Sequence, residues 1–462
     1  MFYLIVVLFI VGYAAIALEH SIKIDKAASA LMTAALIWVC IAFGADHIYS
    51  GMTVFQEFLN EHPGTTVMEY ITQHELIEHL GSVSEILFFL LGAMTIVEII
   101  DSHGGFLILS KVIRTVNKVK LLWILSFLTF FISAALDNLT TTIVMIALMR
   151  KIIGGKNTRW FFASMIVIAA NAGGAWSPIG DVTTIMLWIG GQITALNIVL
   201  NVLLPSIVSL LIPLIIVSFT MKGNAVPPSR TDRAKSLVPT TDRERWIILL
   251  SGVGGLLFVP IFKSVTHLPP YLGVLFVLSI MWIMTEILHR KKQIDIKVSL
   301  TLSGILKKID TPTILFFLGI LLAVAGLESA GHLHLLSTFL DEKVHNIYAI
   351  NIAIGALSSI VDNVPLVAGT MGMYDVVTPD ALAAIADPAT AAYKAYYMQD
   401  GTFWELLAYC AGTGGSMLII GSAAGVAAMG IAKIDFMWYV KKVTLLAGAG
   451  YLAGAATYIL LN

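Results

Sequence analysis

The sequence predicts an all-α polytopic membrane protein built from two repeats of inverted topology. Of its 462 residues, 58% are apolar and only 12% are charged, and the mean hydropathy is +0.88. Soluble proteins carry about twice that share of charge, roughly a quarter of their residues. Apolar runs of about 20 residues, the length that spans a bilayer core, recur along the chain. In addition, three short sequences of the first half return in the same order in the second half.

The repeated sequences define the duplicated unit. Residues 133–138, SAALDN, return 225 positions later as residues 358–363, SSIVDN. Residues 173–181, GGAWSPIGD, return after 241 positions as residues 414–422, GGSMLIIGS, and an ILFFL sequence at 86–90 returns after 228 positions. Duplication in membrane proteins often builds a binding site where the two halves meet.

The chain divides into segments in this order. Residues 1–26 form an extra transmembrane helix, which we expect to be retained because a signal peptide would have a charged n-region. The first repeat covers residues 27–221, with a re-entrant hairpin at about 121–153 and a broken helix at about 160–195. Residues 222–245, rich in Pro, Ser, Thr and charge, form a cytoplasmic linker. The polar segment 48–80 has no assigned role.

The second repeat, with a leading helix, covers residues 246–461. It contains a hairpin at about 347–377, an acidic periplasmic insertion at 375–400 and a broken helix at about 403–432. We therefore expect about ten spanning helices and two hairpins.

The basic residues favour this topology. With the N-terminus outside and both Asp-Asn stretches folded as hairpins, 25 of the 28 Lys and Arg residues fall on the cytoplasmic side, as the positive-inside rule expects. If each Asp-Asn stretch crossed the membrane once, this asymmetry would largely disappear. The same topology directs residues 86–90 inward and residues 314–318 outward, so the two repeats are inverted.

Glycine and proline interrupt both broken helices. Within a helix Gly costs about 1 kcal/mol and Pro about 3 kcal/mol relative to Ala, and Pro178 lies between glycines. Non-helical backbone at membrane depth is tolerated only where it lines a cavity or is buried in protein. Glycines that merely let helices pack closely are the alternative, but matched positions in both halves favour unwound binding segments. The helix-break glycines are Gly173, Gly174, Gly180, Gly414, Gly415 and Gly421.

Three acids lie in these apolar segments. An ionised carboxylate near the bilayer centre costs several kcal/mol unless it is paired or hydrated, which favours a direct role for Asp137 and Asp362. Each can also cap the second arm of its hairpin, and the two roles are compatible. Asp181 has no acidic counterpart, because Ser422 occupies the equivalent position.

Neutral oxygen ligands accompany these acids. Carboxylates, hydroxyls and amide oxygens suit a hard cation such as Na⁺ or Li⁺, and a buried carboxyl close to like charges also retains a proton more readily. Competition of proton and cation for one cluster suffices for an exchanger. The predicted ion- and proton-binding set, including the Na⁺ site, is Asp137, Asn138, Asn171, Asp181, Thr183, Thr184, Ser358, Asp362, Asn363 and Ser416.

Other functions have little support. The net charge of −1 gives no reason to expect a nucleic-acid partner, and Cys40 and Cys410 lie in apolar runs, so neither a disulfide framework nor a thiol metal site is expected. His74 and His79 are five positions apart and diverge on a helix, which disfavours a shared metal. Neither a nucleophile with a base nor a cofactor motif is evident, so we expect no enzyme and no cofactor.

The stretches 135–142, 171–184 and 358–367 resemble the NhaD-type sodium/proton antiporters of the ion transporter superfamily. The resemblance implies export of cytoplasmic Na⁺ or Li⁺ in exchange for H⁺ across a bacterial inner membrane, by alternating access, for sodium and pH homeostasis. It also implies two inverted repeats and a homodimer in the lipid bilayer. Stoichiometry and discrimination against K⁺ stay open.

The principal alternative is a sodium-coupled di- or tricarboxylate carrier of the same superfamily. Such carriers typically have Ser-Asn-Thr at the hairpin tips, where helix N-termini hold the anion. This chain has Asp at those places, which would repel a carboxylate. A metalloid exporter is a further alternative.

Overall fold

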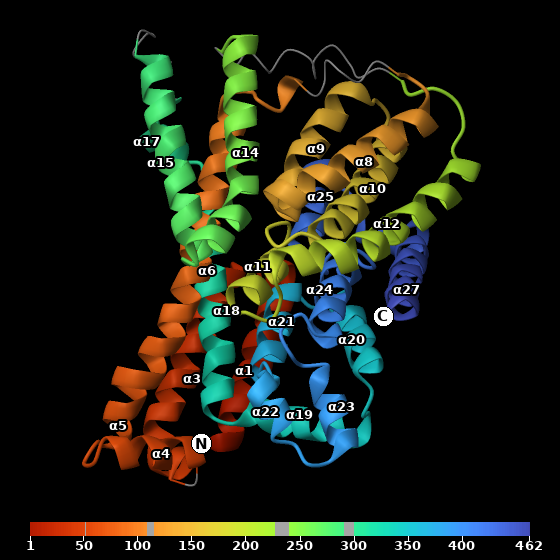
Figure 1. Ribbon diagram of the computed structural model, residues 1–462. Coiled ribbons are helices and arrows are strands. Elements are labelled where there is room, and N and C mark those ends of the chain that lie inside the picture. The colour runs from red at the N-terminus through yellow and green to blue at the C-terminus, as the bar shows by residue number, and fades with distance from the viewer. Residues whose placement is uncertain (51, 109–114, 227–239, 291–299) are drawn as a thin grey trace. The chain divides into compact units, whose positions relative to one another are not determined.

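The computed structural model describes residues 1–462 except 51, 109–114, 227–239 and 291–299. Apart from two isolated β-bridges, the regular structure in these described ranges is helical (Figure 1). In this described part of the chain, eight helices are long and apolar enough to cross a membrane. The number is nine if Ala423–Ala432 and Phe436–Lys442, which are bent by 115° at the break between them, count as one span. The eight are Lys26–Tyr49, Val67–Ser102, Lys118–Leu136, Ala195–Thr220, Asp242–Thr266, Pro270–His289, Thr311–Ser329 and Thr444–Leu461. The chain is therefore a multi-pass membrane protein.

This number is slightly below the ten spans expected from the apolar runs. The first run forms α1, Phe2–Ala17, which has 16 residues and falls short of the 20 that typically span a bilayer. The runs near 160 and 403 form α10, Lys156–Ala175, and α24, Thr402–Gly414, both of which end at glycine-rich breaks. The predicted linker lies partly outside the described residues, at 227–239.

One compact unit comprises residues 1–90, 310–346 and 368–375. In it, α3 (Lys26–Tyr49) packs against α1 and against α18 (Thr311–Ser329). The contact with α18 is close, because a Cβ atom at Gly319 would lie 2.6 Å from the backbone of Ala30. Small residues at such contacts let membrane helices approach. The unit also contains α2 (Glu19–Ile22), α4 (Thr53–Glu61), α5 (Val67–Tyr70), the π-helix Ile71–Glu75, the first part of α6 (Leu76–Ser102), and α19 (His332–Lys343).

The second unit comprises residues 91–309, 347–367 and 376–462. It holds both copies of the Asp-Asn repeat, both copies of the Gly-Gly repeat and every residue of the predicted binding set. Its other helices are α8 (Lys118–Leu136), α9 (Asn138–Ile152), α11 (Val182–Ile189), α12 (Ala195–Thr220), α14 (Asp242–Thr266), α15 (Pro270–His289), α17 (Leu302–Leu306), α20 (Ile347–Leu357), α25 (Ala423–Ala432), α26 (Phe436–Lys442) and α27 (Thr444–Leu461), with the start of α21 (Asn363–Met373).

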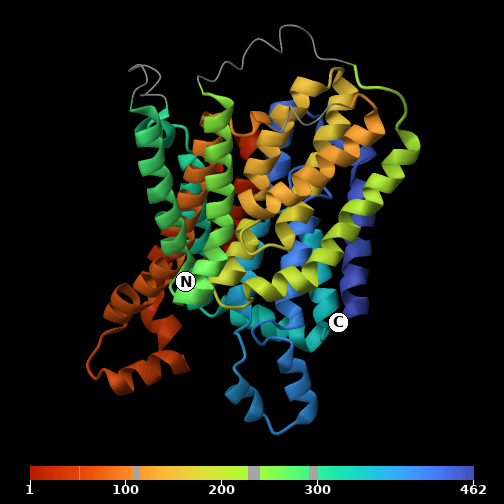
Figure 2. The same cartoon turned by 45° about the horizontal axis from the view of Figure 1, so that its top comes forward.

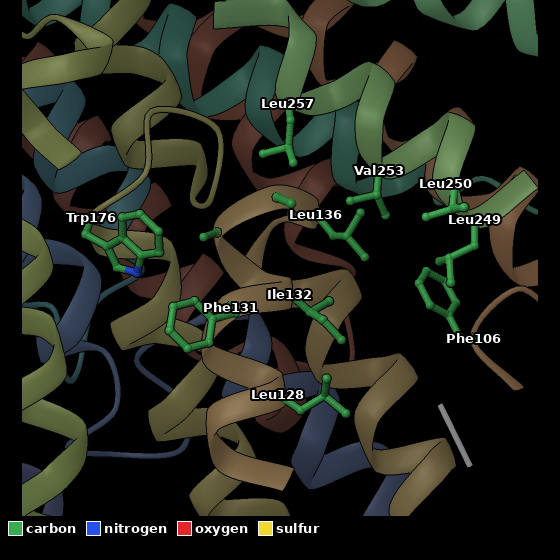
Figure 3. Close-up of a pocket in the computed structure, with 12 residues that line it drawn as sticks. Phe106, Leu128, Phe131, Ile132, Leu136, Trp176, Leu249, Leu250, Val253 and Leu257 are labelled. Atoms are coloured by element: carbon green, nitrogen blue, oxygen red, sulfur yellow. The ribbon is translucent and has the colours of Figure 1, made fainter. Parts of the chain in front are cut away.

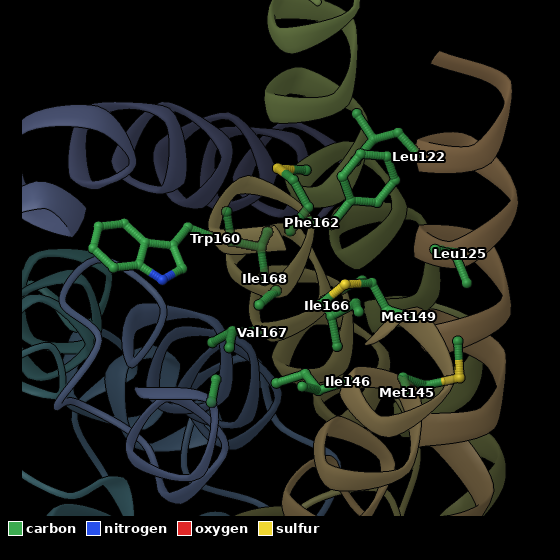
Figure 4. Packing of buried hydrophobic residues seen from close by; sticks show 14 of the residues in the cluster. Leu122, Leu125, Met145, Ile146, Met149, Trp160, Phe162, Ile166, Val167 and Ile168 are labelled. Carbon is green, nitrogen blue, oxygen red and sulfur yellow. The ribbon is translucent and has the colours of Figure 1, made fainter. Parts of the chain in front are cut away.

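In this unit an apolar core packs the helices α8, α9 and α10 of the first repeat against one another. Figure 4 shows Leu122 and Leu125 of α8, Met149 of α9 and Phe162 of α10 facing one another, all at most 1% exposed. This packing fixes α8 and α9 against α10, and α12 and α25 also contact it. The insertion 375–400 forms the short helices α22 (Pro379–Ala383) and α23 (Pro388–Ala395), which extend away from α24 (Figure 2).

The glycine-rich segments interrupt the helices as the sequence predicted. Helix α10 ends at Ala175 and α11 begins at Val182, while α24 ends at Gly414 and α25 begins at Ala423. The glycines also permit close backbone contacts. A Cβ atom at Gly173 would lie 2.2 Å from Phe130 O, and one at Gly414 would lie 2.0 Å from Gly355 O.

These two contacts are equivalent by the repeat offsets, since Phe130 and Gly355 are 225 positions apart and Gly173 and Gly414 are 241 apart. A second equivalent pair consists of hydrogen bonds. Ser133 Oγ donates to Ala170 O at 2.6 Å, and Ser358 Oγ donates to Ala411 O at 2.9 Å. The duplicated sequence therefore makes duplicated contacts between each Asp-Asn segment and its neighbouring helix.

Candidate functional site

Asp181 lies at the centre of a buried polar cluster. It caps the N-terminus of α11, where its Oδ1 accepts a hydrogen bond from Thr183 N at 3.1 Å. The hydroxyl of Thr184 donates to Asp181 O at 2.9 Å and accepts from Asp181 N at 3.2 Å. The Asp181 side chain is 1% exposed. The non-helical segment after Pro178 thus carries a carboxylate into the interior at a helix N-terminus, where the helix dipole favours negative charge.

Both repeats supply an asparagine to this carboxylate. Asn138, at the start of α9, donates from Nδ2 to Asp181 Oδ2 at 2.6 Å. Asn363, at the start of α21, donates from Nδ2 to both carboxylate oxygens at 3.3 Å. Because the two asparagines are repeat equivalents, the duplicated segments converge on one acid that has no duplicate.

Asn171 extends the cluster across the second helix break. Its Oδ1 accepts from Asn138 Nδ2 at 3.1 Å, and its Nδ2 donates to Ser416 Oγ at 3.0 Å and to Ser422 Oγ at 2.9 Å. All of these side chains are at most 5% exposed. The structure therefore brings together five members of the predicted set: Asn138, Asn171, Asp181, Asn363 and Ser416.

The remaining predicted residues have more local contacts. Asp137 has φ +75° in the one-residue turn between α8 and α9, and its carboxylate accepts from Thr140 N at 2.8 Å and Thr140 Oγ1 at 2.7 Å. The predicted capping role is thereby confirmed. Asp137 and Asp362 each precede an asparagine that donates to Asp181, and Ser358 holds its segment against α24 through Ala411 O. No observation assigns these three, Thr183 or Thr184 to an ion.

Sequence reasoning omitted Ser422 from the binding set. Its hydroxyl accepts from Asn171 Nδ2 and also from Gly425 N at 3.2 Å, as the cap of α25. The signal was available, because Ser422 is the repeat equivalent of Asp181. Asp181 and Ser422 thus cap the equivalent helices α11 and α25 in the same cluster, one with a carboxylate and the other with a hydroxyl.

The cluster is rich in oxygen and poor in nitrogen or sulfur ligands. Within the described ranges, no group of three or more His, Cys, Asp or Glu side chains is placed to hold a metal ion. Asparagine amides can present either N–H donors or a carbonyl oxygen after rotation by about half a turn. The three amides and two hydroxyls can therefore stabilise the ionised Asp181 carboxylate when it is alone. Together with that carboxylate they can also surround a hard cation.

An apolar cavity of about 330 Å³ lies close to the same segments. Figure 3 shows it between Phe131 and Leu136 of α8, Trp176 and the α14 residues Val253 and Leu257. Its lining is hydrocarbon and indole, which cannot replace the hydration shell of an ion. The buried polar cluster, and not this cavity, is the candidate ion site.

Known proteins are similar to this chain over nearly its whole length. A family model described as "Citrate transporter" matches residues 6–394. "Sodium/proton antiporter 1" of Arabidopsis thaliana is 45% identical over 98% of this chain and 71% of its own length, and "Sodium/proton antiporter 2" of the same plant is 42% identical over 98% of each chain. "Na(+)/H(+) antiporter NhaD" of Vibrio cholerae is 31% identical over all of this chain and 92% of its own.

The apolar helices and these matches define the class of protein: a multi-pass membrane protein of the citrate transporter family, to which the chain belongs. Within that family it groups with the NhaD-type sodium/proton antiporters.

Proposed function

We propose that this protein is a secondary active antiporter that exports Na⁺ or Li⁺ in exchange for H⁺, with Asp181 as the group for which cation and proton compete. The observation that carries the proposal is the convergence of Asn138 and Asn363 on the buried Asp181 carboxylate. The names of the relatives support the same substrates.

The chemistry follows from the ligand set. When Asp181 is ionised and no cation is bound, the amide N–H groups of Asn138 and Asn363 stabilise its charge. When Na⁺ enters, these amides rotate so that their oxygens, together with the hydroxyls of Ser416 and Ser422, complete the ion's coordination. When a proton binds instead, the carboxyl becomes neutral and the cation loses its main ligand. Exchange results because Asp181 carries one of the two ions, never both.

The remaining acids support cation selectivity. Asp137 and Asp362 adjoin the two asparagines that donate to Asp181, so carboxylates at these positions attract a cation and repel an anion. A sodium-coupled di- or tricarboxylate carrier is the second candidate, because the matching family model is described as a citrate transporter. That function would bring a carboxylate substrate toward three acids, which is electrostatically unfavourable.

The proposal includes an architecture for alternating access. The turn at Asp137 and the segment before Asn363 are the tips of two re-entrant hairpins, and the two repeats have inverted topology, so the hairpins approach Asp181 from opposite sides of the membrane. Opening one tip at a time would expose the carboxylate alternately. We further propose a homodimer in the bacterial inner membrane.

The test is a flux assay in everted membrane vesicles that carry an acid-inside pH gradient. Na⁺ and Li⁺ should dissipate the gradient, whereas citrate should not. K⁺ is added in a parallel sample to measure discrimination between the cations. Asp181→Asn should lose the response while the protein remains folded. Asp387→Asn, which changes an exposed cap in the insertion, is the matched control and should behave as wild type. A citrate response without a sodium response would establish the carrier function instead.

A further inference from the structure

A second buried carboxylate, Glu405, lies outside the cluster around Asp181. It occupies the first turn of α24 and is 2% exposed. Two amides of α12 donate to its Oε1, Asn197 Nδ2 and Asn201 Nδ2, the latter at 2.8 Å. From α27, Tyr458 OH donates to its Oε2 at 2.5 Å. Three helices thus meet at one carboxyl group.

Glu405 lacks a cationic partner in the part of the chain that the structure describes. Among the described residues, no Lys, Arg or His nitrogen lies within ion-pair distance of it. Of the residues that the structure describes, the charged and titratable groups next to Glu405 are Asp400 and Tyr458, and Tyr348 lies near Tyr458. The Asp400 carboxylate accepts from Thr194 N at 2.6 Å and Thr194 Oγ1 at 2.8 Å, so it adds negative charge. A buried acid without a counter-ion is costly when ionised.

The surroundings of Glu405 can hold the carboxyl in either protonation state. When it is ionised, three N–H and O–H groups donate to it. When it is protonated, its own O–H can donate to the Tyr458 oxygen, because the Tyr458 hydroxyl also lies 3.5 Å from Thr402 O and can turn to donate there. Both amides keep their acceptor on Oε1 in each state. Proton binding therefore leaves no buried donor unsatisfied.

Helix α24 links Glu405 to the ion site. Gly412 follows Glu405 by seven residues, which places it two turns away on nearly the same face, at a rise of about 10 Å. A Cβ atom at Gly412 would lie 3.9 Å from Asp181 Oδ2. By the repeat offset of 241 the counterpart of Glu405 is Ser164, whose hydroxyl donates only to Trp160 O of its own helix, at 2.8 Å. The first half therefore has no equivalent acid.

We propose that Glu405 is a second proton-binding group of the exchanger, separate from Asp181, and that it carries one additional proton per transport cycle. This inference rests on the proposed antiport. The proton binds to a Glu405 oxygen and leaves from it, with no other bond made or broken. Because that proton is not exchanged for a cation at the same group, it raises the ratio of protons to cations by one.

The first experiment measures the coupling ratio in proteoliposomes, from the membrane potential and pH gradient at which Na⁺ flux reverses. Glu405→Gln should retain exchange with a ratio one proton lower than that of wild type. An unchanged ratio would overturn the proposal. Tyr451→Phe is the matched control, because Tyr451 is another buried α27 tyrosine whose hydroxyl donates to a backbone oxygen, Ile352 O, and it should leave the ratio unchanged.

The second experiment needs no transport and separates this inference from the antiport proposal. Infrared difference spectra of the purified protein, recorded as the pH is lowered without Na⁺, should contain a protonated-carboxyl C=O band that Glu405→Gln lacks. Tyr458→Phe should move the midpoint of that band by about one pH unit toward alkaline pH, because the lost hydrogen bond stabilises the charged form more than the neutral one. Identical spectra for wild type and Glu405→Gln would refute proton binding at Glu405, whatever the flux assay gives.

Discussion

The two halves of the second unit use the same backbone contacts for different chemistry. Each half has a helix that breaks after a Gly-Gly pair, a close approach of that helix to its Asp-Asn segment, and a serine that donates across the contact. The polar side chains differ. Asp181 caps the break in the first half, where the second half has Ser422, and Asn171 corresponds to Gly412.

This difference shows how a duplicated scaffold comes to surround one buried acid instead of two. The duplicated backbone positions two breaks and two asparagine-bearing segments around a common centre. Only one acid occupies that centre, so both halves act on a single carboxylate. Substitutions that remove or increase the difference between the two halves should therefore affect exchange and stability to different degrees.

The largest effect is expected from removing the unique acid. Asp181→Ser makes the first cap equal to the second, and it should reduce Na⁺-dependent pH-gradient dissipation to background because the cluster loses its central charge. Adding Ser422→Asp to this variant returns an acid to the equivalent cap. Partial recovery in the double variant would support equivalent positions, whereas full activity of Asp181→Ser alone would contradict a central role for Asp181.

Next in size are changes at the matched glycines. Gly173→Ala and Gly414→Ala would each bring a Cβ within 2.2 Å of a backbone oxygen, and overpacking of this kind costs about 1–3 kcal/mol. Both variants should show lowered melting temperatures in detergent. Gly430→Ala in α25 is the control, because a Cβ there meets nothing within 4 Å. A change at only one of the two glycines would indicate that the breaks are not equivalent.

A smaller effect should distinguish the two asparagines. Asn138 donates to Asp181 at 2.6 Å and Asn363 at 3.3 Å. A hydrogen bond to a charged group contributes about 1.5–3 kcal/mol, so its loss in Asn138→Ala favours protonated Asp181 over the ionised form. Because the proton then competes more strongly and the amide oxygen is also lost as a cation ligand, the Na⁺ concentration for half-maximal exchange should rise by about tenfold or more. Asn363→Ala should raise it less. The reverse order would show that the shorter hydrogen bond does not stabilise the Asp181 charge more than the longer ones.

The smallest effects concern pH. Protons compete with Na⁺ at Asp181, so the Na⁺ concentration for half-maximal exchange should fall as the pH rises from 6 to 9, and a flat profile would argue against a shared carboxylate. Asp387 provides the control. Hydrogen bonds from the side chain and backbone of Thr390 lower the pKa of this exposed carboxyl, so it stays ionised throughout. Asp387→Asn should leave the profile unchanged.

The sequence predicted the helix breaks and five of the six residues of the buried polar cluster, all except Ser422. Gly-Gly pairs and Pro178 destabilise a continuous helix through their intrinsic helix propensities, which do not depend on tertiary packing. Asp137 caps its helix as expected. Repeat symmetry identified Asp181 as exceptional. The inverted arrangement of the two repeats stays a prediction from charge distribution.

Other features depend on tertiary packing that no local pattern encodes. The hydrogen bonds of Asn171 to Ser416 and Ser422 join residues about 250 positions apart. Glu405 follows an acidic insertion and its repeat counterpart is Ser164, so no sequence pattern distinguishes it from an ordinary acid in the first turn of a helix. Only the positions of Asn197, Asn201 and Tyr458 reveal that it is buried.

The most direct test of the central claim is proton release on Na⁺ binding to the purified protein, followed with a pH-sensitive dye in weak buffer. If Na⁺ and H⁺ compete for Asp181, Na⁺ should release protons from wild type and from Asp387→Asn, but not from Asp181→Asn. Equal proton release from Asp181→Asn and wild type would contradict the account.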